Sequence, residues 1–83
     1  MTFRISRENQ DHGTLLRIDG KISDDGLSEL RKFWKSAISP LTVDLGGLSQ
    51  VDDMILKELQ LMEREGVKLI NASPYLKLQL DNY

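Results

Sequence analysis

Apolar and polar residues alternate in four short segments of this chain, residues 2–7, 14–19, 41–45 and 67–71. Such alternation is typical of β-strands that bury one face and expose the other. Parallel strands covered on both faces are instead apolar throughout. The pattern therefore predicts a sheet whose helices lie mainly on one face and whose second face is mostly polar.

Segments with helical spacing follow three of these strands. A helix is expected from about Ser23 to Ser39, and a second from about Asp52 to Glu65, with Gly66 at its C-terminal cap. Ser73 and Pro74 are suited to the start of a third, short helix. The expected buried positions of the first two helices are Leu27, Leu30, Trp34, Ala37, Ile38, Ile55, Leu56, Leu59 and Met62.

These elements give the order β-β-α-β-α-β-α. The polar turn at Asn9–Gly13 predicts a hairpin, whereas strands joined through a helix are expected to be parallel. We expect residues 1–83 to form a single α/β domain with a four-stranded mixed sheet. Residues Gly46–Gln50 are expected to form a loop after the third strand.

Composition excludes several classes of function. The 83 residues include no cysteine and one histidine, so thiolate metal sites, disulfides and clusters of several histidines are excluded. The formal net charge is −2 and no segment is strongly basic, which argues against nucleic-acid binding. The apolar runs are much shorter than the ~20 residues that span a bilayer, and the N-terminus lacks an apolar signal region. We therefore expect a soluble, cytoplasmic protein.

No catalytic constellation can be assembled from these residues. Acidic pairs occur at Asp24/Asp25 and Asp52/Asp53, but adjacent residues at a helix start do not face each other across a substrate. His12 lies in a polar turn. We therefore predict a non-enzymatic protein without a metal or cofactor. The Gly46–Gly47 pair leaves open a backbone contact to a nucleotide phosphate, although such a pair also occurs in ordinary turns.

Three segments, residues 15–22, 43–52 and 65–74, resemble the STAS domain, a family named for sulfate transporters and anti-sigma factor antagonists. The middle segment, Val43-Asp44-Leu45-Gly46-Gly47-Leu48-Ser49-Gln50-Val51-Asp52, is the most specific of the three. The resemblance covers nearly the whole chain. It implies a STAS-like fold and a bacterial regulatory protein that binds other proteins.

The regulatory motif of the family is similar to residues 52–55, but it is altered in this chain. The motif reads Asp-Ser-Ser/Thr-Gly, and a partner kinase phosphorylates its first serine in anti-sigma factor antagonists. Here Asp52 matches the motif, whereas Asp53, Met54 and Ile55 replace the other three residues. Asp53 is thus either a permanent mimic of the phosphoserine or, like Asp52, a candidate cap of the helix. Both interpretations are kept open.

The resemblance places partner binding at the start of the second helix and at the preceding loop. The expected site comprises Gly46, Gly47, Ser49, Asp52, Asp53, Met54, Ile55 and Leu56. The implied partner is an anti-sigma-type kinase or another ATPase. Two alternatives are an accessory subunit of a transport ATPase or transporter, and a small dimeric scaffold or ligand-binding domain.

Other residues bear on how surfaces of the chain are used. Few residues follow the third helix in comparison with the family, which leaves a sheet edge less covered and favours a homodimer there. Trp34 is expected in the core and Phe33 is expected to be partly exposed. Met54 and Leu61 lie off the apolar stripe of their helix and are candidates for the rim of a partner surface. The basic residues Arg31, Lys32 and Lys35 are expected to form a solvated helix face.

Overall fold

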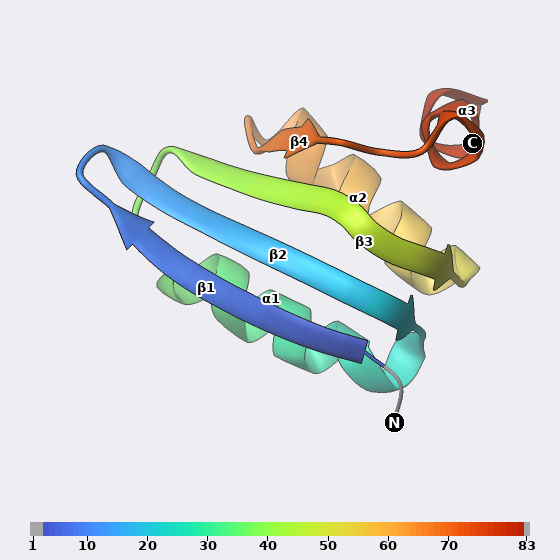
Figure 1. Cartoon of the computed structure of the whole chain (residues 1–83), viewed down its shortest axis with the longest axis horizontal. Coiled ribbons are helices and arrows are strands. Elements are labelled where there is room, and N and C mark those ends of the chain that lie inside the picture. Colours follow the sequence, from blue (N-terminus) through green and yellow to red (C-terminus); the bar gives the residue numbers. More distant parts are fainter. Residues whose placement is uncertain (1–2, 83) are drawn as a thin grey trace.

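Four strands form one sheet in the order β1-β2-β3-β4, and the connecting helices cover one of its faces (Figure 1). The computed structural model describes residues 3–82, so Thr2, which was included in the first predicted strand, lies outside the described residues. The strands are β1 (Phe3–Gln10), β2 (Gly13–Ile22), β3 (Leu41–Val51) and β4 (Lys68–Ile70). The helices are the 3-10 turn η1 (Asp24–Gly26), α1 (Leu27–Ser36), α2 (Asp53–Arg64) and α3 (Pro74–Asn82). This order confirms the predicted β-β-α-β-α-β-α arrangement.

Strand directions also follow the prediction. β1 pairs with β2 in an antiparallel hairpin, whereas β2 with β3 and β3 with β4 are parallel pairs. Figure 1 shows α1 and α2 behind the sheet and no helix in front of the strands, while α3 lies past the carboxyl end of β4, near the last residues of β3. None of the helices within residues 3–82 combines the length and apolar character needed to cross a membrane.

The predicted loop at Gly46–Gln50 was wrong, because these residues continue strand β3. Gly47 pairs with Asp19 and Gln50 with Lys21 of β2, across two irregularities in the register. A side chain at Gly47 would collide with the carboxylate of Asp19, which would have to move to another position. Pairing with the long strand β2 therefore overrides the local turn composition of this segment.

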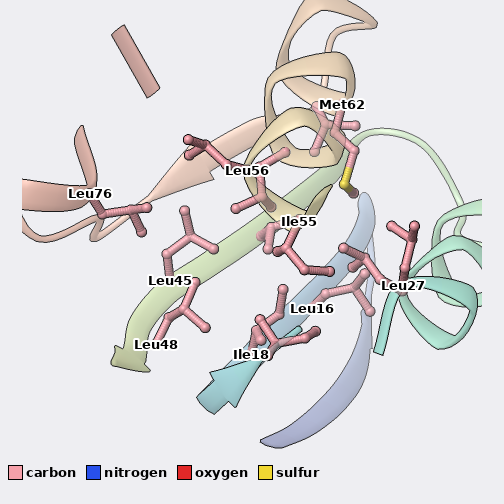
Figure 2. Packing of buried hydrophobic residues seen from close by; sticks show 14 of the residues in the cluster. Leu16, Ile18, Leu27, Leu45, Leu48, Ile55, Leu56, Met62 and Leu76 are labelled. Atoms are coloured by element: carbon pink, nitrogen blue, oxygen red, sulfur yellow. The ribbon is translucent and has the colours of Figure 1, made fainter. Parts of the chain in front are cut away.

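The core lies between the sheet and the two helices α1 and α2. Leu16 and Ile18 of β2 meet Ile55 and Met62 of α2, as Figure 2 shows, and all four side chains are fully buried. The predicted stripes are confirmed for Leu27, Leu30, Ile55, Leu56, Leu59 and Met62.

The end of the first helix differs from the prediction. α1 stops at Ser36, so Ile38 leaves the helical stripe and its side chain is 61% exposed. The buried hydroxyl group of Thr14 accepts a hydrogen bond from the backbone N–H of Ile38 and donates one to its carbonyl, at 2.9 Å each. These two bonds fix the backbone of the connection between α1 and β3, while the side chain of Ile38 points to solvent. Trp34 is only half-buried rather than a core residue, and Phe33 is partly buried, as expected.

One charged residue lies where an apolar one would be expected. Glu58 of α2 is buried, with 5% of its side chain exposed, and its carboxylate accepts a hydrogen bond of 3.2 Å from the guanidinium of Arg31. Arg31 extends from α1, so the ion pair joins the two helices. Met54 and Leu61, which lie near Glu58 on α2, are 49% and 40% exposed, in agreement with their predicted place off the buried stripe.

Candidate protein-binding site

The start of α2 is organised by the carboxylate of Asp52. Its backbone is extended, and its Oδ1 atom accepts a hydrogen bond of 3.0 Å from the backbone N–H of Ile55. This is the N-cap geometry that satisfies one of the free N–H groups of a helix start. Asp52 rather than Asp53 is thus the cap, which settles one of the two roles left open for these residues.

The second carboxylate oxygen of Asp52 reaches another element. Its Oδ2 atom accepts a hydrogen bond of 2.9 Å from the backbone N–H of Asp24 in η1. The side chain of Ser23, where the first helix was expected to begin, makes no capping hydrogen bond, and its hydroxyl group donates to the carboxylate of Asp25, at 2.7 Å. One aspartate therefore joins the starts of both helical segments, and sequence reasoning did not predict this link.

This link brings four carboxylates together at one end of the helical layer. We call Asp24, Asp25, Asp52, Asp53 and the adjacent Met54 the acidic corner. Asp53 is exposed at the first position of α2, and Met54 is 49% exposed. The partial positive charge of the helix N-terminus favours carboxylates at such positions. Within residues 3–82 no group of side chains has the arrangement of a metal site.

Two of the predicted site residues point away from any partner. Ile55 is 0% exposed and Leu56 is 1% exposed, and Figure 2 shows both side chains within the cluster of buried residues. They position the start of α2 by packing on the sheet and α3. The surface that the structure offers here is therefore limited to Asp52, Asp53 and Met54.

The two predicted glycines of β3, Gly46 and Gly47, lie apart from this corner. Gly47 is five residues before Asp52 on an extended strand, a separation of roughly 16 Å at ~3.3 Å per residue. The N–H of Gly46 already donates to the carboxylate of Asp44, at 2.8 Å. A phosphate placed there would meet a negative charge, so this geometry argues against the phosphate contact that the glycine pair left open.

Two hollows flank the carboxyl end of β3, beside the acidic corner. One of about 250 Å³ is lined by Lys21, Ile22, Ser23, Gln50, Val51 and Asp52. The other, of about 140 Å³, lies against α3 and is lined by Leu48, Ser49, Gln50, Val51, Ser73, Tyr75, Leu76 and Gln79. Ser49 thus faces α3 rather than the start of α2. Gln50 belongs to the segment that was predicted to bind a partner, whereas Lys21 and Tyr75 were not predicted, although the carboxyl ends of parallel strands are a common position for binding sites.

A polar cluster on the open face of the sheet is centred on Asp44. The backbone N–H of Gly46 and the side-chain amide of Asn71 both donate to its Oδ1 atom, at 2.8 and 3.1 Å, and the Arg17 Nε atom lies 3.5 Å from Oδ2. These contacts, with the Gly46 hydrogen bond as the largest cause, lower the pKa of Asp44 below its usual 3.8. Asn71 adopts a left-handed backbone (φ 61°) to make its contact.

The lowered pKa of Asp44 predicts a pH-dependent contribution to stability. A carboxyl whose pKa is lower in the folded state stabilises the protein above its unfolded pKa, and this contribution disappears as pH falls toward the folded value. We expect Asp44→Asn to lower the free energy of unfolding by about 0.5–1 kcal/mol at pH 7 and by clearly less at pH 3. Urea unfolding at both pH values measures this, with Asp11→Asn in the β1–β2 turn as the control. An equal loss at both pH values would contradict it.

Comparisons with known proteins identify the fold. No family model matches the chain, and no related curated protein was found. Among solved structures, it is similar to the crystal structure of an anti-sigma-factor antagonist STAS domain from Rhodobacter sphaeroides, with a TM-score of 0.63. The match covers 88% of this chain and 94% of that chain, at 15% sequence identity. The protein therefore has the STAS fold, which confirms the predicted architecture.

Proposed function

We propose that this protein is a non-enzymatic regulatory module that binds a partner protein through the acidic corner. The observation that carries the proposal is the exposure of Asp53 and Met54 at the start of α2, on a STAS fold. In the anti-sigma factor antagonists that the sequence resembles, the phosphorylated serine occupies the position of Asp53. A fixed carboxylate there supplies one negative charge, where a phosphate group supplies ~1.5–2.

The geometry of the corner supports a docking role for Asp53. Asp52 uses both carboxylate oxygens within the chain, so it is committed to structure. The carboxylate of Asp53 makes no hydrogen bond or ion pair within residues 3–82, and its charge faces solvent next to the apolar side chain of Met54. A partner surface with a cation beside an apolar patch would complement this pair. The proposed partner is an ATPase, such as an anti-sigma-type kinase.

Reversal of the charge at Asp53 tests this proposal. We expect wild-type protein to retain an ATPase in a pull-down from a lysate of its source cells, and Asp53→Lys to lose it. With the purified ATPase, calorimetry should show binding at least about tenfold weaker for Asp53→Lys, which corresponds to ~1.4 kcal/mol. Asp11→Lys makes the same charge change in the remote β1–β2 turn and should bind like wild type.

The results distinguish the proposal from its alternatives. Equal binding by wild type and Asp53→Lys would move the interface away from the acidic corner. Retention of a transport ATPase would identify the chain as an accessory subunit of a transport system. An Asp53→Ser variant that an anti-sigma-type kinase binds and phosphorylates would place the protein in that pathway, whereas no such reaction would limit the similarity to the fold.

A further inference from the structure

Two hollows lie along α1, one between α1 and α2 and the other at the connections that lead into β3 and β4. One hollow of about 520 Å³ is lined by Ser28, Arg31, Lys32, Trp34, Lys35 and Glu58. A second, of about 480 Å³, is lined by Trp34, Ala37, Ser39, Pro40, Leu41, Glu65, Gly66 and Val67. Half-buried Trp34 lines both hollows, so they adjoin at this residue, and we refer to the two together as the groove.

The first part of the groove carries an excess of positive charge. Arg31 is bound to the buried carboxylate of Glu58, which fixes the guanidinium at the base of the groove. Lys32 and Lys35 are both exposed, and neither makes an ion pair within residues 3–82. The first hollow thus has two ammonium groups without an ion-pair partner and is also lined by Trp34, whereas the one charged residue that lines the second hollow is Glu65.

The dimensions of the groove fit a short peptide rather than a compact ligand. From Ser28 to Ala37 the chain advances nine residues, or roughly 13 Å at ~1.5 Å per helical residue. An extended peptide covers this length with about four residues at ~3.3 Å each. An apolar side chain over Trp34, flanked by carboxylates near Lys32 and Lys35, would match both the ring and the charges.

We infer that the groove between α1 and α2 binds an acidic peptide segment of a partner protein, with an apolar residue against Trp34 and carboxylates at Lys32 and Lys35. This site is separate from the acidic corner and has the opposite charge. It revises the interpretation of Arg31, Lys32 and Lys35 as a solvated helix face. Loss of binding here leaves the proposed role of Asp53 unaffected, so the two proposals can fail independently.

Trp34 is the single tryptophan of the chain, so its fluorescence reports directly on the groove. The probe is the blocked peptide acetyl-Asp-Glu-Leu-Glu-Asp-amide, titrated into the 83-residue chain at low salt. We expect a saturating change in Trp34 emission that weakens as salt screens the charges. The neutral peptide acetyl-Asn-Gln-Leu-Gln-Asn-amide should produce no saturating change. No response to the acidic peptide, or an equal response to both peptides, would overturn the inference.

Charge-reversal variants test the two lysines on which the inferred acidic-peptide site depends. Lys32→Glu/Lys35→Glu should weaken binding of the acidic peptide at least about tenfold, while Arg31 is left intact because it pairs with buried Glu58. Lys68→Glu/Lys77→Glu makes the same change in net charge at exposed positions on β4 and α3 and should bind like wild type. Circular dichroism and urea midpoints verify that both variants fold. Equal weakening in both variants would refute the acidic-peptide site.

Discussion

Replacement of Ile55 by glycine is expected to remove a large part of the stability of this protein. The Ile55 side chain is 0% exposed and points from α2 into the cluster that includes Leu16 and Ile18 (Figure 2). Truncation of a buried isoleucine costs about 2–5 kcal/mol, and glycine in a helix adds about 1 kcal/mol. We therefore expect Ile55→Gly to lower the free energy of unfolding by roughly 3–6 kcal/mol.

That loss is comparable with the total stability of a domain of this size. At about 0.05–0.15 kcal/mol per residue, a chain of this length has roughly 4–12 kcal/mol in all. Urea unfolding followed by circular dichroism measures the change. Met54→Gly is the matched control, because Met54 is the adjacent residue of the same helix and is 49% exposed. It should cost only about 1 kcal/mol, mainly through helix propensity. Similar losses in the two variants would contradict the role of Ile55 in the core.

This prediction bears on the regulatory motif that the sequence resembles. Glycine stands at the position of Ile55 in that motif, and serine at the position of Asp53. Asp53 is exposed, so its exchange for serine alters a surface, whereas the exchange at position 55 alters the core. Reconstruction of the whole motif would therefore change the stability of the protein together with its surface, so partner binding could not be interpreted from that variant alone. The single variant Asp53→Ser is the informative one.

The elements and their order could be predicted because short-range patterns determine them. The alternation in β2 and the helical spacing in α2 each bury one face, and the structure places those faces in the core. Gly66 at the end of α2 (φ 99°) and Ser73 before α3, whose hydroxyl group accepts from the N–H of Leu76 at 3.1 Å, are local signals that the structure confirms.

Features that depend on distant partners could not be predicted in the same way. Residues Gly46–Gln50 have the composition of a turn, yet pairing with β2 keeps them in a strand. Glu58 looks like a surface residue until Arg31, 27 positions earlier, is placed beside it. The groove around Trp34 likewise exists only because α1 and α2 pack side by side. The part of the candidate site at the start of α2 could be predicted because it lies within one short segment. The link from Asp52 to Asp24 could not, because it joins two separate segments.

The acidic corner itself depends on Asp52, and its removal is expected to have the second-largest effect. Asp52→Ala deletes the cap of α2, worth about 1 kcal/mol, and the hydrogen bond to the N–H of Asp24. The second bond is exposed, so water replaces part of it and its loss adds about 0.5–1.5 kcal/mol. The neighbouring carboxylates repel one another, but between exposed charges this relief amounts to only a few tenths of a kcal/mol. The two hydrogen bonds of Asp52 outweigh the repulsion between carboxylates, so we expect Asp52→Ala to lower the free energy of unfolding by about 1.5–2.5 kcal/mol.

Two companion variants separate the contributions of Asp52. Asp52→Asn retains one acceptor oxygen and should lose about half as much stability as Asp52→Ala. Asp53→Ala removes an exposed carboxylate with no partner within residues 3–82 and should change stability by less than about 0.5 kcal/mol. Hydrogen exchange should accelerate at the amides of Asp24 and Ile55 in Asp52→Ala and remain unchanged in Asp53→Ala. Equal stability losses for Asp52→Ala and Asp53→Ala would mean that Asp52 does not join the two helix starts. If the losses differ as expected, Asp53 is free to face a partner because Asp52 alone maintains the structure of the corner.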